Sequence, residues 1–478
     1  MCPHHHFRLS CIAVTALVAA GLSGCGGGSA SGKNSGYTVG GTVTGLAGSG
    51  LVLQTGDGSE VAIAANGSFV LPSTMPSGSS YALTTKAQPT TPAQNCVIAN
   101  ASGQVTDANI SNIVVTCTDK GRFAYVSSHS GIYCFAVDVM TGAMTTIAPS
   151  PCDSGVLTGV AVDPSGQFAY ATDSIANQIR AYTIDASTGA LTAIAGSRLD
   201  AGSVPCNNEY PINPNNCGAA SNPLDITVDP TGHFVYMADY GGSISAYAID
   251  PATGSLTTIS GSPFPTAPAI VAGQVPGANS VTVDPTGRFL YVAISQGNDI
   301  SGYTIDLGSG ALSPISGSPF AAGDAPMTIR VDPSGKFAFV TNANSNNISA
   351  YSIDATSGAL TPIAQSPFST KGLFPVGLAI DPSGNFIYAT NSESSSISGF
   401  AINSGTGTLS PIEGSPFPSV SNPASVAVHP SGQYLYVGSD EISGYAIDPT
   451  TGSLTPIVGS PFGAVVAGSG VYSFGFAN

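Results

Sequence analysis

Tryptophan is absent from this 478-residue sequence, and charged residues make up only 8% of it. Basic residues are the scarcer kind, with 11 Lys and Arg against 27 Asp and Glu, for a net charge of −16. Nucleic-acid binding needs clusters of Lys and Arg, and the chain has none, so we expect no nucleic-acid partner. P-loop, EF-hand, G-x-S-x-G and H-E-x-x-H motifs are also missing, so none of the corresponding mechanisms is expected.

The N-terminus reads as a targeting segment followed by a tether. Arg8 supplies positive charge, an apolar run extends from Cys11 to Leu22, and Leu22-Ser-Gly-Cys25 follows. The run is shorter than the ~20 residues that span a bilayer, and the tetrad resembles a bacterial lipobox. We expect a signal peptide at 1–24, lipid including palmitate on Cys25, and a Gly/Ser tether at 25–36. An ordinary secretory signal with an incidental cysteine is the alternative.

A lipid on Cys25 would make the membrane a partner of this protein. The chain would then be held at the cell envelope and exposed to the periplasm or the cell surface. Gly26 does not resemble the signal for retention in the inner membrane, so the outer membrane is favoured.

Cysteine usage agrees with export. Of nine cysteines, six remain once Cys2 and Cys11 leave with the signal and Cys25 carries lipid. Six cysteines can pair in fifteen ways. Proximity in the sequence suggests the pairs Cys96–Cys117, Cys134–Cys152 and Cys206–Cys217, and disulfides form in oxidising compartments. Zinc binding is the rival, but the chain has no C-x-x-C and no His at ligand spacing, so no metal is predicted.

Residues 37–118 form a unit without repeat character. Short alternating segments such as Tyr37–Val43 and Ser68–Leu71 are separated by turn signals such as Asn66-Gly67. They predict a small β-sandwich closed by the Cys96–Cys117 disulfide. The unit loosely resembles the Ig-like or transthyretin-like modules of bacterial surface proteins, and this resemblance carries no site.

From residue 119 the chain becomes a repeat array. A unit V-x-V-D-P-[ST]-G-x-[FY]-x-[YF]-[VA], then [YF]-x-I-D-x-x-[ST]-G-x-L, recurs, with its first-turn prolines at 164, 230, 285, 333, 382 and 430. A period near fifty residues made of short strands is typical of a β-propeller, with four strands per unit. Asp-Pro-Ser-Gly is turn chemistry, so we interpret these aspartates as structural. His429, which replaces Asp in the last copy, is also interpreted as a turn residue.

The C-terminus supplies the strand that the ring still needs. The first unit lacks its own inner strand, and Val471 follows Phe462 by nine residues, as Val426 follows Phe417. A strand at 471–476 would therefore complete the first blade and leave no free sheet edge. Residues 119–478 are thus predicted to form an all-β, seven-bladed β-propeller, preceded by the β-sandwich, and we expect a monomer.

The repeats resemble those of the seven-bladed lactonase family, which includes bacterial 6-phosphogluconolactonase. The likeness rests on Asp-Pro-Ser-Gly-x-Phe-x-Tyr-Val and Tyr-x-Ile-Asp-x-x-Thr-Gly-x-Leu and covers residues 121–478. Phe339-Val-Thr-Asn342 is also similar to the related Tyr-Val-Thr-Asn repeats. The resemblance implies hydrolysis of a lactone, which needs a base and hydrogen-bond donors beside the ester carbonyl.

One feature that the resemblance implies is absent. Family enzymes that act on anionic lactones resemble one another in placing His and Arg just before the inner strands. The aligned pairs here contain neither residue: Thr158-Gly159, Leu224-Asp225, Asn279-Ser280, Met327-Thr328, Val376-Gly377 and Ala424-Ser425. This departure favours binding without turnover.

Candidate site residues lie on the channel face, where propeller ligands usually bind. The ligand rim is predicted to consist of Asp239, Tyr240, Glu209 and Tyr210, the last two on an extra loop closed by Cys206–Cys217. Such a stapled loop is a recognition element, or alternatively a surface loop without a ligand. The same face is expected to display Asp173, Asp324, Glu393, Asp440 and Glu441.

Three residues are the candidates for catalysis. Arg330 lies mid-strand where the other repeats have Ala or Thr, and a charge between packed blades is costly unless paired. It either faces the channel or forms a structural ion pair, and the pair is favoured. His129 lies in a loop, where a histidine without a chemical role is the commoner case. Together with Asp225, these two could serve a hydrolase.

The preferred interpretation is an envelope lipoprotein whose propeller binds a small molecule, a glycan or an envelope protein without turnover and without a cofactor. The alternative is a lactone hydrolase that acts on a neutral lactone, because an acidic rim repels a sugar phosphate. Cation binding by the acidic rim is a third hypothesis.

Overall fold

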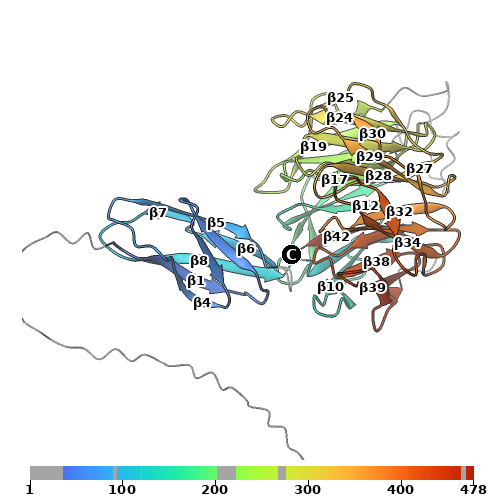
Figure 1. Ribbon diagram of the computed structural model, residues 1–478. Coiled ribbons are helices and arrows are strands. Elements are labelled where there is room, and N and C mark those ends of the chain that lie inside the picture. The colour runs from blue at the N-terminus through green and yellow to red at the C-terminus, as the bar shows by residue number, and fades with distance from the viewer. Residues whose placement is uncertain are drawn as a thin grey trace, which may run out of the picture.

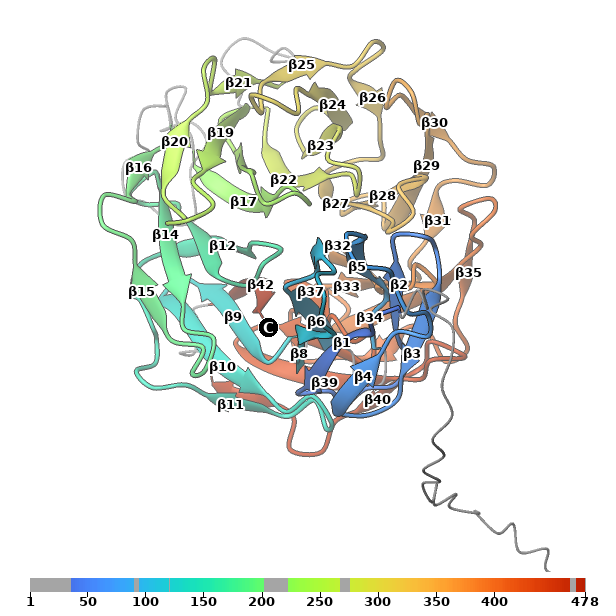
Figure 2. The ribbon, with the colours of Figure 1, turned by 90° about the vertical axis from the view of Figure 1, so that its left-hand side faces the viewer.

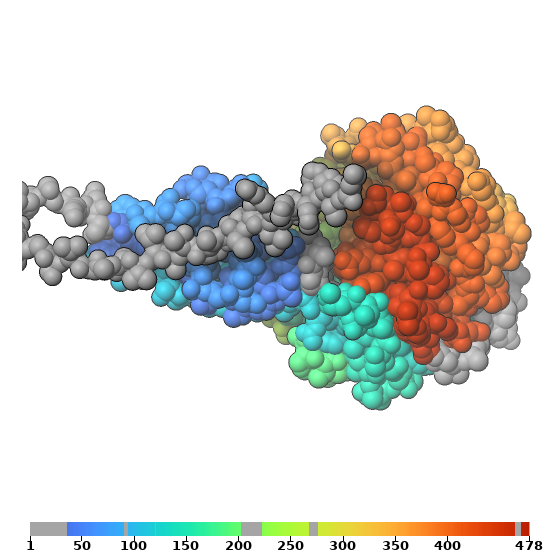
Figure 3. All heavy atoms as spheres, turned by 60° about the horizontal axis from the view of Figure 1, so that its bottom comes forward, coloured from blue at the N-terminus to red at the C-terminus, as the bar shows by residue number. Residues whose placement is uncertain are grey.

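The computed structural model describes residues 36–89, 94–119, 121–201, 222–266, 276–464 and 470–477. They form two bodies (Figures 1 and 3), which are an N-terminal pair of sheets and a ring of seven sheets (Figure 2). Every regular element within these ranges is a β-strand, which confirms the all-β prediction of a seven-bladed propeller preceded by a small sandwich. No helix in the described ranges is long and apolar enough to cross a membrane.

The N-terminal module packs two four-stranded sheets, ordered β4-β1-β8-β6 and β3-β2-β5-β7. Its strands are β1 (Val39–Thr44), β2 (Leu51–Thr55), β3 (Glu60–Ile63), β4 (Gly67–Val70), β5 (Ser80–Ala87), β6 (Gln94–Ala99), β7 (Ser102–Gln104) and β8 (Ile110–Asp119). Alternate residues such as Val39, Leu53 and Val115 point into the shared core, as period-two patterning requires. Cys96 and Cys117 pair across β6 and β8 and form the first predicted disulfide.

Each propeller blade is an antiparallel sheet whose strands occupy repeated positions. The inner strands are β42 (Val471–Ala477), β12 (Leu157–Val162), β17 (Pro223–Val228), β22 (Ala278–Val283), β27 (Pro326–Val331), β32 (Pro375–Ile380) and β37 (Ser425–Val428). The second strands are β9 (Phe123–Ser128), β13 (Phe168–Asp173), β18 (Phe234–Asp239), β23 (Phe289–Ile294), β28 (Phe337–Asn342), β33 (Phe386–Asn391) and β38 (Tyr434–Gly438).

The remaining positions lie farther from the axis. The third strands are β10 (Gly131–Val137), β14 (Gln178–Ile184), β19 (Ser243–Ile249), β24 (Asp299–Ile305), β29 (Asn347–Ile353), β34 (Ser396–Ile402) and β39 (Glu441–Ile447). The outer strands are β11 (Met144–Thr146), β15 (Leu191–Ala193), β20 (Leu256–Thr258), β25 (Leu312–Pro314), β30 (Leu360–Pro362), β35 (Leu409–Pro411) and β40 (Leu454–Pro456). The blades are numbered 1 to 7 in the order of these lists.

Blades 2 to 7 also contain a fifth, short strand that the four-strand prediction did not include. These strands are β16 (Leu199–Asp200), β21 (Phe264–Pro265), β26 (Phe320–Ala321), β31 (Phe368–Ser369), β36 (Phe417–Pro418) and β41 (Phe462–Ala464). The reason is one of length, because a three-residue outer strand covers only half of the seven-residue third strand. The segment that leads to the next blade pairs with the uncovered half, as Phe320 does with Ile300.

The first blade joins the two ends of the propeller. β42 pairs antiparallel with β9, with Phe476 opposite Ala124 and Val471 opposite Ser128. The expected strand at 471–476 is therefore one residue longer, and every inner strand has a neighbour in its own blade.

The Asp-Pro-[ST]-Gly turns hold the inner strand to the second strand. In blade 2, Asp163 accepts the backbone N–H of Ser165 with one carboxylate oxygen and that of Phe168 with the other. Asp229 in blade 3 makes the same bonds with Thr231 and Phe234. These aspartates are thus structural.

Tyrosine hydroxyls tie neighbouring blades together in two series, which we call the rungs. In the forward rungs, a second-strand Tyr donates at 2.7–3.1 Å to a Gly carbonyl of the next blade: Tyr125–Gly189, Tyr170–Gly254, Tyr236–Gly310, Tyr291–Gly358, Tyr388–Gly452 and Tyr436–Gly142. In the backward rungs, a third-strand Tyr donates at 2.7–3.2 Å to the fifth strand of the preceding blade: Tyr247–Asp200, Tyr303–Pro265, Tyr351–Ala321 and Tyr445–Pro418.

Candidate functional site

A cavity of about 580 Å³ is lined by residues of the inner strands. These strands surround the centre of the ring in Figure 2. Its wall is built from the start of these strands in blades 2 to 4, from most of their length in blades 5 to 7, and from β42 of blade 1. Hydroxyl and amide side chains are interspersed with apolar ones in this wall. Beside the three candidates below, the polar members are Thr158, Ser174, Asn279, Ser280, Thr328, Ser425, Tyr472 and Ser473. The repeat thus brings one position of each blade to a common centre.

The three candidate catalytic residues, His129, Asp225 and Arg330, all line this cavity. They come from different blades, since His129 follows β9, Asp225 lies in β17 and Arg330 in β27. Sequence reasoning left open whether Arg330 faces the channel or forms an ion pair. The structure shows both, because Arg330 lines the cavity and its Nη1 lies 3.8 Å from Oδ2 of Asp225.

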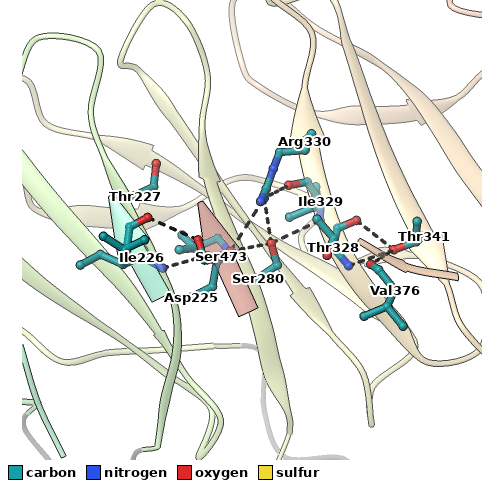
Figure 4. A network of polar contacts seen from close by, with 12 residues as sticks. Asp225, Ile226, Thr227, Ser280, Thr328, Ile329, Arg330, Thr341, Val376 and Ser473 are labelled. Atoms are coloured by element: carbon teal, nitrogen blue, oxygen red, sulfur yellow. Dashed lines mark hydrogen bonds and ion pairs between the residues drawn. The ribbon is translucent and has the colours of Figure 1, made fainter. Parts of the chain in front are cut away.

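Ser280 lies between these two charges and bonds to both (Figure 4). Its hydroxyl donates to Oδ2 of Asp225 at 2.8 Å and accepts from Nη1 of Arg330 at 3.1 Å. Asp225 also accepts the N–H groups of Val281 and Ile226, so each of its oxygens is hydrogen-bonded. The network spans blades 3, 4 and 5 and fixes a carboxylate and a guanidinium on one wall.

His129 lies on the part of the wall that blade 1 provides, where it contacts Tyr472. Their rings meet edge to face with centroids 4.7 Å apart, and the phenol hydroxyl is within hydrogen-bond distance of the imidazole. Burial lowers the pKa of His129, which favours the neutral imidazole at neutral pH. A neutral imidazole in a cavity can accept a proton, which is the property a general base requires.

Two of the expected rim residues, Asp239 and Tyr240, do not line the cavity. Asp239 is fully buried at the end of β18, where it accepts hydrogen bonds from Ser243 and Ser245, and burial raises its pKa to about 7. Tyr240 is half-buried beside it. The physical reason is that the second strand lies farther from the propeller axis than the inner strand. The last side chain of the second strand therefore packs within its own blade. Four further expected residues are exposed but lie away from the cavity: Asp324, Glu393, Asp440 and Glu441.

Asp173, also expected on the channel face, belongs to a buried ionic cluster that sequence reasoning missed. Arg180 of β14 pairs with Asp173 and, at 2.8 Å, with Asp153. Tyr182 donates to Asp153 at 2.6 Å. Although burial opposes it, these bonds hold the pKa of Asp153 below its usual value. The second predicted disulfide, Cys134–Cys152, anchors the loop that carries Asp153, so the cluster braces blade 1 against blade 2.

Some predictions concern residues outside the described part of the chain. They are the third disulfide, Cys206–Cys217, the rim residues Glu209 and Tyr210, and the lipidation site Cys25. Among the residues that the structure describes, no three His, Cys, Asp or Glu side chains gather in a way that would hold a metal ion.

Two residues of the site were not identified from the sequence. Ser280 stands in one of the aligned pairs before the inner strands, where family enzymes that act on anionic lactones place His and Arg. Tyr472 lies in the closing strand, and its position next to Val471 was a signal that it would face the axis. Both supply hydroxyl groups, which the repeat does not distinguish from its many other Ser and Tyr residues.

Comparison with solved structures places the propeller among known folds. A candidate 6-phosphogluconolactonase from Bacteroides uniformis superposes with a TM-score of 0.62 at 19% identity, covering 74% of this chain and 99% of that one. The periplasmic gluconolactonase PpgL of Pseudomonas aeruginosa gives a TM-score of 0.59 at 17% identity, covering 74% of this chain and 99% of PpgL. At these identities the likeness concerns the fold alone. No curated protein matches the sequence.

The sequence itself carries the family assignment. The model of the family described as "Lactonase, 7-bladed beta-propeller" matches residues 81–206, 194–314, 244–374, 328–421 and 370–467. These overlapping matches run through most of the propeller, and the repeated Asp-Pro-Ser-Gly turns and tyrosine strands described above lie within them. The chain belongs to the seven-bladed β-propeller lactonase family.

Proposed function

We propose that the axial cavity binds a small, hydroxyl-rich ligand of the sugar-lactone class and holds it without turnover. The observation that carries the proposal is that His129, Asp225 and Arg330 line one cavity of about 580 Å³. Small-molecule sites commonly enclose roughly 300–1,000 Å³. The hydroxyl groups of the wall suit a ligand with many hydroxyls, and membership of a lactonase family supports lactones as the first ligands to test.

Charge argues against a sugar phosphate as the ligand. Arg330 and Asp225 offset one another in the wall, and His129 is favoured in its neutral form. A phosphate dianion would therefore meet one guanidinium already beside a carboxylate, in a protein with a net charge of −16. A ligand with no charge, or with one, suits this site better.

Calorimetry with a stable sugar γ-lactone tests the binding proposal. We expect Ala424→Phe, which fills the cavity wall, to abolish binding by full-length protein in detergent. Ala252→Phe in an exposed turn is the matched control and should bind like the wild type. Binding that survives Ala424→Phe would place the ligand elsewhere, and the absence of binding to the wild type would refute the proposal.

Hydrolysis of a neutral lactone is the second candidate, and the pairing of His129 with Tyr472 favours it. In this mechanism, the imidazole of His129 removes a proton from water while the water oxygen adds to the lactone carbonyl. The ring C–O bond then breaks, and the leaving alcohol oxygen takes up the proton, which gives a hydroxy acid. Arg330 would donate hydrogen bonds to the developing oxyanion.

Titration of released acid tests this mechanism. Turnover above the spontaneous rate, reduced at least about a hundredfold in His129→Gln, would establish hydrolysis, because a positioned base contributes roughly 10²–10⁴-fold. His233→Gln, which changes an exposed histidine, is the matched control. No turnover above the spontaneous rate would leave ligand binding as the function.

We also propose that the protein acts at the cell envelope, anchored by lipid on Cys25. The support is the tetrad Leu22-Ser-Gly-Cys25 after an apolar run. Labelled palmitate should be incorporated into the wild type and not into Cys25→Ser, and the outer-membrane fraction should contain only the former. Equal labelling of both would refute the anchor.

A further inference from the structure

Arg330 is a cation in a wall position that other blades give to small or uncharged side chains. The corresponding residues of β12, β22 and β32 are Ala161, Thr282 and Ala379. The side chain of Arg330 retains 37% of its exposure, and it lines both the axial cavity and an adjoining hollow of about 330 Å³. It is therefore placed to meet a ligand.

Among the residues that the structure describes, only those at one end of the guanidinium form hydrogen bonds with it. Nη1 donates to the carbonyl of Ile329 at 2.8 Å and to Ser280 at 3.1 Å. Nε and Nη2 make no hydrogen bond to the residues that the structure describes. These two nitrogens lie on one edge of the planar group, and their parallel N–H bonds match the two oxygens of a carboxylate.

Asp225 does not occupy that edge. Its contact with Arg330 is through Nη1 and, at 3.8 Å, is longer than a hydrogen bond. Its oxygens already accept hydrogen bonds from Ile226, Ser280 and Val281. Asp225 thus orients Nη1 through Ser280 and leaves the Nε–Nη2 edge available to a ligand.

The charged side chains of the wall favour a ligand with a single negative charge. Among the described residues that line the two cavities, Arg330 is the one Lys or Arg side chain and Asp225 the one acidic side chain. A single carboxylate can use the open edge, whereas a dianion would have no second cation. The wall hydroxyls Thr328, Ser425 and Ser473 lie in the same cavity and suit a hydroxylated chain.

We propose that the Nε–Nη2 edge of Arg330 binds the carboxylate of a small hydroxy acid, the ring-opened form of a lactone. This proposal rests on the proposed function, that the axial cavity is the ligand site, and adds the chemical form that it prefers. The protein would then take up the product of a reaction that opens lactones, whether that reaction occurs here or in another enzyme.

Calorimetry at pH 7.5 with galactonate and its uncharged analogue galactonamide tests the preference in full-length protein. We expect wild type to bind the acid roughly tenfold more tightly, because hydrogen bonds between charged groups are the stronger kind. Arg330→Gln should remove this preference, so that the variant binds galactonate and galactonamide with similar affinity. Arg330→Lys keeps the positive charge but lacks the two parallel N–H bonds, so it should retain only part of the preference for the acid.

Arg288→Gln is the matched control. Arg288 is a half-buried arginine that packs over Phe289 and donates to the carbonyl of Ala355, outside the cavity. It should behave as the wild type, and melting temperatures verify that each variant folds. Equal affinity of wild type for acid and amide, or a preference retained in Arg330→Gln, would overturn the inference alone. No binding of acid, amide or lactone by the wild type would overturn the proposed function as well.

Discussion

At the scale of single residues, His429 links the last blade to the chain that enters the first. It is fully buried, and its Nδ1 accepts the N–H of Ser431, as the aspartates of other blades accept the equivalent N–H. Since Nδ1 is the acceptor, Nε2 carries the proton and donates to the carbonyl of Gly121 at 2.9 Å. An aspartate could not donate this bond, which explains the exchange of Asp for His.

We predict that His429 makes the fold sensitive to mild acid. Burial lowers its pKa to about 4 from 6.5. Below pH 6.5 the unfolded chain binds a proton that the folded chain excludes, so stability falls as pH decreases. Between pH 7.5 and pH 5 the loss is about 2 kcal/mol. In urea unfolding, the free energy of unfolding of the wild type should fall by this much more than that of His429→Asn between the two pH values. His233→Asn is the control and should behave as the wild type. Equal losses in wild type and His429→Asn would contradict the prediction.

Asp239 is a buried acid where two other blades have an amide. Asn342 and Asn391 donate to Ser349 and Ser398 from the same position at the end of the second strand. Asp239 instead accepts from Ser245, and burial raises its pKa to about 7 from 3.8. Between these values the unfolded chain has lost a proton that the folded chain keeps, so stability declines as pH rises from about 4 to about 7.

Asp239→Asn should therefore stabilise the protein at pH 8, by up to roughly 4 kcal/mol, since each unit of pKa shift corresponds to about 1.4 kcal/mol. The gain should shrink as the pH falls towards 3.8 and disappear well below it, where wild-type Asp239 is neutral in both states. Asp185→Asn is the matched control, because Asn403 already fills that exposed turn position in blade 6. A gain independent of pH would show that titration of Asp239 is not its cause.

At the scale of elements, each rung joins the strands of two blades through one buried hydrogen bond. Tyr236→Phe removes the bond from β18 to the carbonyl of Gly310 and leaves the ring in place. We expect a loss of about 1 kcal/mol in the free energy of unfolding, the usual net value of such a bond. Tyr240→Phe, outside the rungs, should change stability little. A neutral Tyr236→Phe would indicate that the Gly310 carbonyl finds another partner.

The elements set by local chemistry could be predicted from the sequence. Asp163-Pro-Ser-Gly166 and its copies specify a turn between two strands through bonds within six residues, so the period alone gives the blades. Both disulfides in the described residues join cysteines near in sequence, and they are as predicted. The short fifth strands were missed because their pairing depends on how much of the third strand the outer strand covers.

The site was less predictable, because it depends on contacts between blades. His129 and Arg330 could be selected since they break the repeat, and both line the cavity. The burial of Asp239 could not be foreseen, because the serines that bond it come from the adjacent strand. The open edge of Arg330 follows only from the geometry of Ser280 in the neighbouring blade.

At the scale of the whole molecule, one seam of the ring differs from the others. Between blades 5 and 6, the two positions that carry the rung tyrosines in other blades are Phe339 and Phe400. Neither side chain has a hydroxyl, so both rungs are missing. Within the described residues, every other pair of adjacent blades has at least one rung. Without rungs, this seam is held by an apolar cluster in which Phe339, Leu378 and Phe400 are buried, and by hydrogen bonds from Thr341 to the carbonyl of Val376 and from Ser398 to the carbonyl of Thr370.

The double variant Phe339→Tyr/Phe400→Tyr should strengthen this seam. By register, the new hydroxyls would reach the carbonyls of Gly407 and Ser369, which correspond to the acceptors Gly310 and Pro265 of other blades. Each bond should add about 1 kcal/mol to the free energy of unfolding, and the two gains should add because the rungs share no partner. Amide hydrogen exchange in β28 and β32 should slow, while Tyr291→Phe at the adjacent seam should accelerate exchange there. A double variant less stable than the wild type would mean that the apolar cluster at this seam has no room for the two hydroxyl groups.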